Sequence, residues 1–491
     1  MARNRLILSL ALLCGLAGCN GRDGGALDIA IMDTADDLFT PGVRLSEGAQ
    51  HVRAATSAGL VTLDARGDVM PALADRWIVT DDGLSFIFRL RDGAWPDGAP
   101  LTADSVRTAL LRNIRALKGT SLGLDLEPIE EVRAMAGRVV EIRLSTPVPL
   151  LLQLLAQPEL AFTLGDGGGT GDMTYTRDGS VATFAMKPPT ERGVPEEEDW
   201  SEHVRPVIVH ALDARAAVAR FGDGSVDVVL GGRIGQLPLA ETGPLSRGTV
   251  QIDPAIGLFG LHVRHARGFL AGEREREALA MAIDRPALIA PFNVAGWDST
   301  TRVVAPGLAD DAGLVAERWL DVPLEDRRME AAGRVAAWRG SSDAPDEPVR
   351  LSIAMGSAPG DAILFRELAG QMARIGIVLE RAGEEAADLV LIDRVARYAA
   401  PRWFLNQFNC RLRSGLCSEE ADALVAAAGE EPVATNRQRL LAEAEARLTV
   451  ANVYIPLGPP VRWSLVRGNV AGFLPNNWAF HPLPALATLP R

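Results

Sequence analysis

The chain contains very little lysine and lacks the short motifs of several common enzyme classes. Its only lysines, Lys118 and Lys187, are followed by Gly and Pro, so the Lys-Ser/Thr step of a phosphate-binding P-loop is absent. Neither the Gly-x-Ser-x-Gly motif of a nucleophile elbow nor the His-Glu-x-x-His motif of zinc proteases occurs. These absences favour a protein that is not an enzyme.

Histidine is also scarce, with six residues, and they form no compact cluster in the sequence. His262 and His265 have a spacing that would place them on one side of a helix, but their surroundings indicate a strand and a loop. We therefore predict no bound metal and no cofactor.

Positive charge is in the minority, since 63 Asp and Glu residues face 50 Lys and Arg residues, for a net charge of −13. An acidic surface argues against nucleic acid and against anionic lipid headgroups as partners. The length of 491 residues allows two or three domains with an ample core.

The N-terminus has the layout of a secretory signal. Arg3 and Arg5 precede the apolar run 6–13, which is too short to remain as a spanning helix. The sequence Leu-Ala-Gly-Cys that ends at Cys19 resembles the bacterial lipoprotein box, in which cleavage leaves the cysteine as the lipidated first residue. The resemblance implies a signal peptide over 1–18, lipidation of Cys19 and a glycine-rich tether over 19–26. An ordinary cleaved signal is the alternative.

Cysteine is rare, with four residues in the chain. Cys14 lies in the signal, and Cys410 and Cys417 remain in the body of the protein, where export permits disulfides. We predict a bridge between Cys410 and Cys417, with two free buried thiols as the alternative. Two thiols with no histidine nearby do not make a zinc site.

The most regular pattern in the chain lies in residues 59–106. Tight turns at 81–83, 92–93 and 97–98 flank a strand in which Leu84, Phe86, Phe88 and Leu90 alternate with other residues. Thr102 is placed to cap a helix with an apolar stripe.

The order of these features resembles the peptide/nickel-type extracellular solute-binding proteins of bacterial ABC importers (solute-binding protein family 5, dipeptide/oligopeptide-binding-like lipoproteins). The shared features are an acidic turn, Pro-Ala-Leu-Ala, Asp-Asp-Gly-Leu, Phe-x-Phe-x-Leu-Arg-Asp-Gly and Trp-x-Asp-Gly-x-Pro-Leu-Thr-Ala-Asp-x-Val. The segment 276–285, which ends in Ala-Ile-Asp-Arg, is a second similarity, and residues 454–480 resemble the closing strands of the family.

Outside this region, alternating strand and helix patterns predict two α/β units. The first is a right-handed β-α-β crossover in a parallel sheet, over 207–209, 213–221 and 226–230. The second runs through 349–355, 363–375, 377–381 and 388–392. We also expect a first strand at 27–31, a strand at 139–144, and helices at 150–155, 274–282, 419–428 and 437–448.

The resemblance implies an α/β fold with two lobes, the periplasmic-binding-protein fold of class II, cluster C type, with an extra small α+β subdomain in the first lobe. We expect the first lobe at 27–49, 160–260 and 458–491, the small subdomain at 50–159, and the second lobe at 261–457. Ligands of such proteins sit between the lobes, which close by hinge motion.

Peptide binders of this family typically pair an Asp of an Asp-Pro step with the ammonium group of the ligand. Here Pro401 is present, but Ala400 stands where the Asp would be. Asp393 is the candidate substitute for that Asp, and Arg394 or Arg397 could instead meet a ligand anion. The alternative for each of the three is a solvated or salt-bridged loop charge. Tyr398, Trp403 and Trp297 are candidate aromatic walls of the cleft.

The function expected from these features is that of a monomeric, lipid-anchored periplasmic receptor. It would deliver a peptide or peptide-like solute to an inner-membrane ABC permease. The missing Asp motivates an alternative: a peptide-binding envelope protein without a transport role, such as a chaperone or the partner of a sensor. A receptor for nickel or another solute ranks below these, and a hydrolase lower still.

Overall fold

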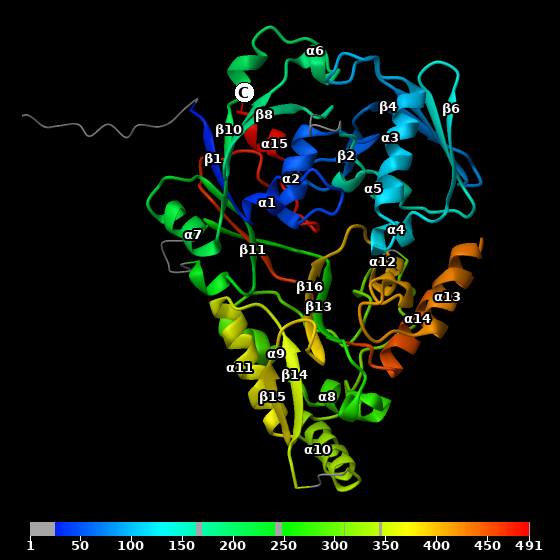
Figure 1. The fold of residues 1–491 in the computed structure, drawn as a ribbon, viewed down its shortest axis with the longest axis vertical. Coiled ribbons are helices and arrows are strands. Elements are labelled where there is room, and N and C mark those ends of the chain that lie inside the picture. The colour runs from blue at the N-terminus through cyan, green and yellow to red at the C-terminus, as the bar shows by residue number, and fades with distance from the viewer. Residues whose placement is uncertain (1–24, 164–168, 241–247, 309, 343–345, 491) are drawn as a thin grey trace, which may run out of the picture.

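The computed structural model describes residues 25–163, 169–240, 248–308, 310–342 and 346–490. The chain forms two α/β lobes, and a small subdomain lies beside the first lobe (Figure 1). This arrangement confirms the predicted fold class. The expected signal peptide and the lipidation site Cys19 lie outside the described residues.

The first lobe contains a seven-stranded sheet of order β12-β18-β11-β1-β10-β9-β8. β1 pairs in parallel with both β10 and β11, so the β-α-β unit predicted from the sequence crosses over β1 by way of α7, which Asp213 caps. The strands are β1 (Leu27–Met32), β8 (Met173–Asp178), β9 (Val181–Met186), β10 (Val207–Leu212), β11 (Val228–Arg233), β12 (Val250–Asp253) and β18 (Arg462–Val466). The helices are α1 (Ala35–Leu38), α2 (Glu47–Thr56), α6 (Pro189–Arg192), α7 (Ala214–Gly222) and α15 (Leu483–Ala487).

The second lobe contains a five-stranded sheet of order β15-β14-β16-β13-β17. Within it, β13 is buried at all seven positions and pairs antiparallel with β16 and β17. The strands are β13 (Gly257–Val263), β14 (Val349–Ala354), β15 (Ile377–Arg381), β16 (Leu389–Val395) and β17 (Tyr454–Gly458). The helices that flank them are α8 (Glu273–Ala282), α9 (Arg285–Ile289), α10 (Leu324–Gly340) and α11 (Pro359–Ala373).

The small subdomain consists of a four-stranded sheet of order β4-β5-β7-β6, the short β2-β3 pair and three helices. Thr102 and Ser105 form a capping box at the start of α3, as the sequence predicts for Thr102. The elements are β2 (Val61–Leu63), β3 (Val69–Pro71), β4 (Ala74–Val79), β5 (Ser85–Leu90), α3 (Ala103–Ala116), α4 (Ser121–Asp125), β6 (Ile129–Met135), β7 (Val139–Leu144) and α5 (Leu151–Leu155).

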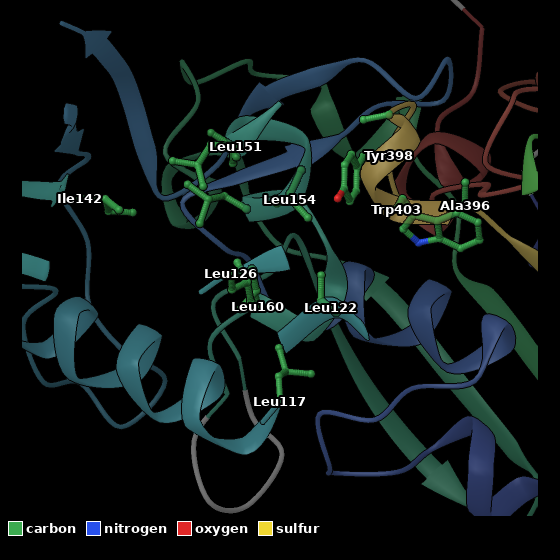
Figure 2. Close-up of a cluster of buried hydrophobic side chains, with 14 of the residues drawn as sticks. Leu117, Leu122, Leu126, Ile142, Leu151, Leu154, Leu160, Ala396, Tyr398 and Trp403 are labelled. Atoms are coloured by element: carbon green, nitrogen blue, oxygen red, sulfur yellow. The ribbon is translucent and has the colours of Figure 1, made fainter. Parts of the chain in front are cut away.

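Of the three helices that follow β16, α12 (Pro401–Asn406) contacts α4 of this small subdomain. Buried residues of α13 (Glu419–Glu430) and α14 (Ala434–Val450) belong to the same hydrophobic cluster as the core of the small subdomain. Figure 2 shows Tyr398 and Trp403 close to Leu122 and Leu154 of the small subdomain, in one continuous hydrophobic cluster. The small subdomain is therefore in contact with both lobes.

Two local features bear on the expected boundaries and the expected bridge. Helix α2 runs through residue 50, the expected start of the small subdomain, and its buried Val52 and Ala55 belong to the core of the first lobe. The predicted disulfide between Cys410 and Cys417 is present, with a Cα–Cα distance of 5.2 Å. No helix within the described ranges is long and apolar enough to cross a membrane.

A buried ion triad holds the largely irregular segments 298–308 and 310–322 against α14. Arg302, with only 6% of its side chain exposed, binds Asp311 through Nη1 and Nη2 at 2.8 and 2.9 Å. The same guanidinium donates to Glu445, which is 2% exposed, at 3.2 and 2.9 Å. Both carboxylates depend on this one cation.

We expect Arg302→Gln to lower the free energy of unfolding by about 3–5 kcal/mol, because it leaves Glu445 and Asp311 buried without a counter-ion. Chemical denaturation measures the change. The matched control is Arg439→Gln, which removes an exposed pair with Glu443 and should cost about 1 kcal/mol or less. Equal losses in the two variants would contradict the role given to the triad.

Candidate functional site

A cavity of about 730 Å³ lies between the two lobes, at the start of α2 and along β16. The first lobe lines it with residues from 43–51, 233–236 and 478–479. The small subdomain contributes residues from 117–122 and Glu159, and the second lobe contributes most of 390–397 together with Gly356, Asp361, Glu384, Trp403 and Gln407. A solute in this space would contact all three parts of the fold.

Four of the six residues proposed from the sequence line this cavity, namely Asp393, Arg394, Arg397 and Trp403. They come together because β16 runs along the cavity and α12 begins a few residues later. Trp403 is only 3% exposed, and it also belongs to the core shared with the small subdomain.

The other two aromatic candidates lie elsewhere. Tyr398 is 3% exposed and borders a separate cavity of about 60 Å³ beside Asp125, whose pKa is raised by burial to about 7. Trp297 packs on Gly458 and donates its indole N–H to the Pro459 carbonyl at 2.9 Å. Both therefore have structural partners outside the main cavity.

An ion triad that joins the two lobes forms part of the cavity wall. Arg462 of β18 donates from Nη1 to Asp393 Oδ1 of β16 at 2.6 Å. Its Nε and Nη2 donate to Glu47 Oε2 and Oε1, at the start of α2, at 2.9 and 3.0 Å. The Arg462 side chain is 2% exposed, so the pairing neutralises a cation that would otherwise be buried alone.

Glu47 and Arg462 were not predicted as site residues. Arg462 did carry a signal, because it stands among apolar residues in a strand that is buried at every position. Arginine is almost never fully buried unless it is paired, so a buried carboxylate partner was to be expected.

The electrostatics of the triad are strong enough to fix the charge of Glu47. Burial alone would raise the pKa of this carboxyl group, but the charges of Arg462 and Arg233 outweigh that effect and lower the pKa to about 2. Arg233 contributes from β11, with Nη2 3.3 Å from Glu47 Oε2.

A second ion pair joins the small subdomain to the second lobe. Arg397 Nη2 lies 2.5 Å from Oε1 of Glu159, whose side chain is 4% exposed. Gln157 donates from Nε2 to the Arg397 carbonyl oxygen at 2.9 Å. Arg397 is thus already engaged by the protein.

Arg394 is different, because its contact is with a neutral amide. Its Nη1 donates to Gln407 Oε1 at 3.3 Å, and no described carboxylate lies within ion-pair distance of it. The side chain is exposed to the cavity, yet surrounding protein desolvates the guanidinium and lowers its pKa.

Histidines make no metal centre in the part of the chain that the structure describes, where no group of three His, Cys, Asp or Glu residues could hold an ion. His262 contacts the Leu416 carbonyl at 3.0 Å, and burial lowers its pKa to about 4. His265 contacts the Glu385 carbonyl at 3.1 Å.

Two α/β lobes with a lined cavity between them define the class of two-lobed solute-binding proteins. Comparisons with known proteins agree, since a sequence model described as bacterial extracellular solute-binding proteins, family 5 Middle, matches residues 68–190. Over these residues the chain is similar to family 5 of the bacterial extracellular solute-binding proteins.

Relatives extend the match over most of the chain. The Salmonella typhimurium periplasmic oligopeptide-binding protein OppA is 23% identical over 469 residues, which cover 84% of this chain and 83% of that protein. The probable deoxycholate-binding periplasmic protein YgiS of Escherichia coli is 34% identical over 128 residues, only 21% of this chain and 22% of that protein.

Among solved structures, Haemophilus influenzae OppA in complex with the peptide RPPGFSPFR aligns with a TM-score of 0.81 at 19% identity. The alignment covers 95% of this chain and 99% of that one. At this identity the likeness establishes the fold.

The low pKa of Glu47 predicts a specific pH dependence of stability. Because the folded pKa lies below the ordinary value of 4.5, the triad stabilises the fold above about pH 4.5 and loses that contribution as the pH falls toward 2. A pKa lowered from 4.5 to about 2 corresponds to about 3 kcal/mol.

We therefore expect Glu47→Gln to be destabilised by up to about 3 kcal/mol at pH 7, with the difference from wild type shrinking as the pH falls toward 3. Urea unfolding between pH 7 and pH 3 measures both curves. Glu443→Gln, which alters an exposed pair, is the control and should stay parallel to wild type. A gap for Glu47→Gln that stays constant over this range would contradict the linkage.

Proposed function

We propose that this protein captures a peptide or peptide-like solute in the cavity between its lobes and delivers it to an ABC permease in the inner membrane. The similarity to family 5 solute-binding proteins supports the receptor role, and the names of OppA proteins, described as oligopeptide-binding, support the choice of solute. The cavity of about 730 Å³ falls within the range of about 300–1,000 Å³ that is usual for ligand pockets.

The observation that carries the peptide proposal is the free edge of β16. All seven of its residues pair with β13, whereas β14 pairs with Leu389 and Val390 only. In an antiparallel ladder every second residue turns its N–H and C=O away from the partner strand, so backbone groups of 391–395 point to the unpaired edge. These same residues line the cavity, where an extended peptide could add as a strand.

Closure around the solute would use the contacts already described between the lobes. Asp393 and Arg462 come from opposite lobes, and so do the surfaces that line the cavity. A ligand that contacts both surfaces binds more tightly when the lobes are closed than when they are open, and so shifts the equilibrium toward closure.

We expect a pool of short peptides to raise the melting temperature of ligand-free protein, because a ligand at 100 times its Kd adds about 2.7 kcal/mol of stability. Thermal-shift and calorimetric titration of protein refolded without ligand measure the effect. Ser121→Trp, which places an indole in the cavity, should abolish the shift, whereas Ser341→Trp, at an exposed helix end, should not. If no peptide pool stabilised the wild type, the peptide proposal would fail.

Anchoring is tested separately from binding. We expect the mature protein to stay with membranes after a high-salt wash and Cys19→Ser to move to the soluble envelope fraction, since more than one acyl chain is needed for stable anchoring. Cys14→Ser is the matched control and should leave the distribution unchanged. Membrane retention of Cys19→Ser would rule out the lipid anchor.

A further inference from the structure

The carboxylates that line the main cavity are already committed to partners within the protein. Glu47 and Asp393 share Arg462, Glu159 is paired with Arg397, and Glu384 lies 3.9 Å from Arg264. The remaining carboxylate, Asp361, caps α11 by accepting from the Ala358 N–H at 2.9 Å. Three of the five acids, Glu47, Asp393 and Glu159, are therefore held by a nearby cation of the protein. The contact of Glu384 is longer, and Asp361 accepts only from a neutral backbone group.

The arginines of the cavity have fewer partners than the acids. Arg394 reaches the neutral Gln407, and Arg44 makes only a 3.5 Å contact with a backbone carbonyl. Over the described ranges neither is within ion-pair distance of a carboxylate. Arg233 shares Glu47 with the closer Arg462.

Arg394 and Arg233 also act on one another. Desolvation lowers the pKa of Arg394, the negative charge of Glu384 acts against this effect, and the positive charge of Arg233 adds to it. Both arginines line the same cavity, so an anion that reaches both would be attracted by two positive charges. Guanidinium groups bind carboxylate or phosphate oxygens in a planar, two-point fashion.

We propose that the cavity selects a solute with an anionic group, which Arg394 binds with the help of Arg233, and that it does not select a free ammonium group at Asp393. The inference rests on the proposed function of the cavity as the solute site. For a peptide-like solute it means a free carboxylate with a blocked or absent amine. A phosphate-bearing solute has the same anionic chemistry.

Two tripeptide pools of identical sequences test the choice of charge. One pool is N-acetylated with a free carboxylate, and the other has a free amine and a C-terminal amide. Citrate and inorganic phosphate serve as anions without a peptide. Calorimetry and thermal shift are measured for wild type, Arg394→Gln, Arg394→Lys, Arg233→Gln and Arg350→Gln. The last variant removes an exposed pair with Glu380, outside the cavity.

We expect the acetylated acid pool to bind wild type, and Arg394→Gln to weaken it about tenfold, the effect of losing one charge-assisted contact. Arg394→Lys should recover part of the affinity because it restores the charge without the planar fork. Arg233→Gln should also weaken the acid pool, and Arg350→Gln should bind as wild type does. Melting curves without ligand show that each variant is folded.

Other outcomes separate this proposal from the peptide function. The anion site would be overturned if wild type bound the free-amine pool as tightly as the acid pool or more tightly. It would also be overturned if Arg394→Gln bound the acid pool as wild type does. Either result would leave the peptide-receptor function intact. Binding of citrate or phosphate through Arg394, without either peptide pool, would retain the anion site and reject the peptide solute. Failure of all four probes would overturn both.

Discussion

The arrangement of the two lobes depends on one buried guanidinium. Arg462 lies in a strand of the first lobe with 2% of its side chain exposed, where an unpaired cation would be prohibitively costly. Its two carboxylate partners come from the start of α2 and from β16 of the second lobe. Neutralising this charge therefore places three separate elements around one point, and the cavity forms beside it.

That constraint also shapes the chemistry of the cavity. A carboxylate in the cavity wall that pointed toward a ligand could bind an ammonium group. Asp393 is instead paired with Arg462 at 2.6 Å. The acid stabilises the contact between the lobes and is correspondingly less available to a solute. The cationic side chains of the cavity, above all Arg394, remain more available to bind a ligand.

Much of the fold could be predicted because its strands and caps have local signals. The alternation of Phe86, Phe88 and Leu90 predicted β5, and β15 begins and ends where the sequence indicated. β13 was not among the predicted strands, because a strand buried on both faces shows no alternation. The long helix α10 was missed since its buried face is narrow, with Ala331 and Val335 among many charged residues.

The site was less predictable, because its main contacts join distant parts of the chain. Asp393 and Arg394 could be singled out from their place near the end of an apolar strand. The ion pair of Arg462 with Glu47 joins residues 415 positions apart in the sequence, and no local pattern predicts it. Tyr398 was expected at the cleft, but the aromatic ring is buried in the core shared with the small subdomain, which a one-dimensional pattern does not distinguish from a cleft wall.

The packing of α12 to α14 on the small subdomain restricts how a solute can enter. Asn406 donates to Asp125 at 2.6 Å across this seam, and both side chains are buried. A rigid opening that keeps the seam intact must move the small subdomain together with the second lobe. An opening that leaves it with the first lobe must wet Asp125 and the apolar side chains around it (Figure 2). A solute can thus enter by either of two openings, and only the opening between the small subdomain and the second lobe requires apolar side chains to be exposed to water.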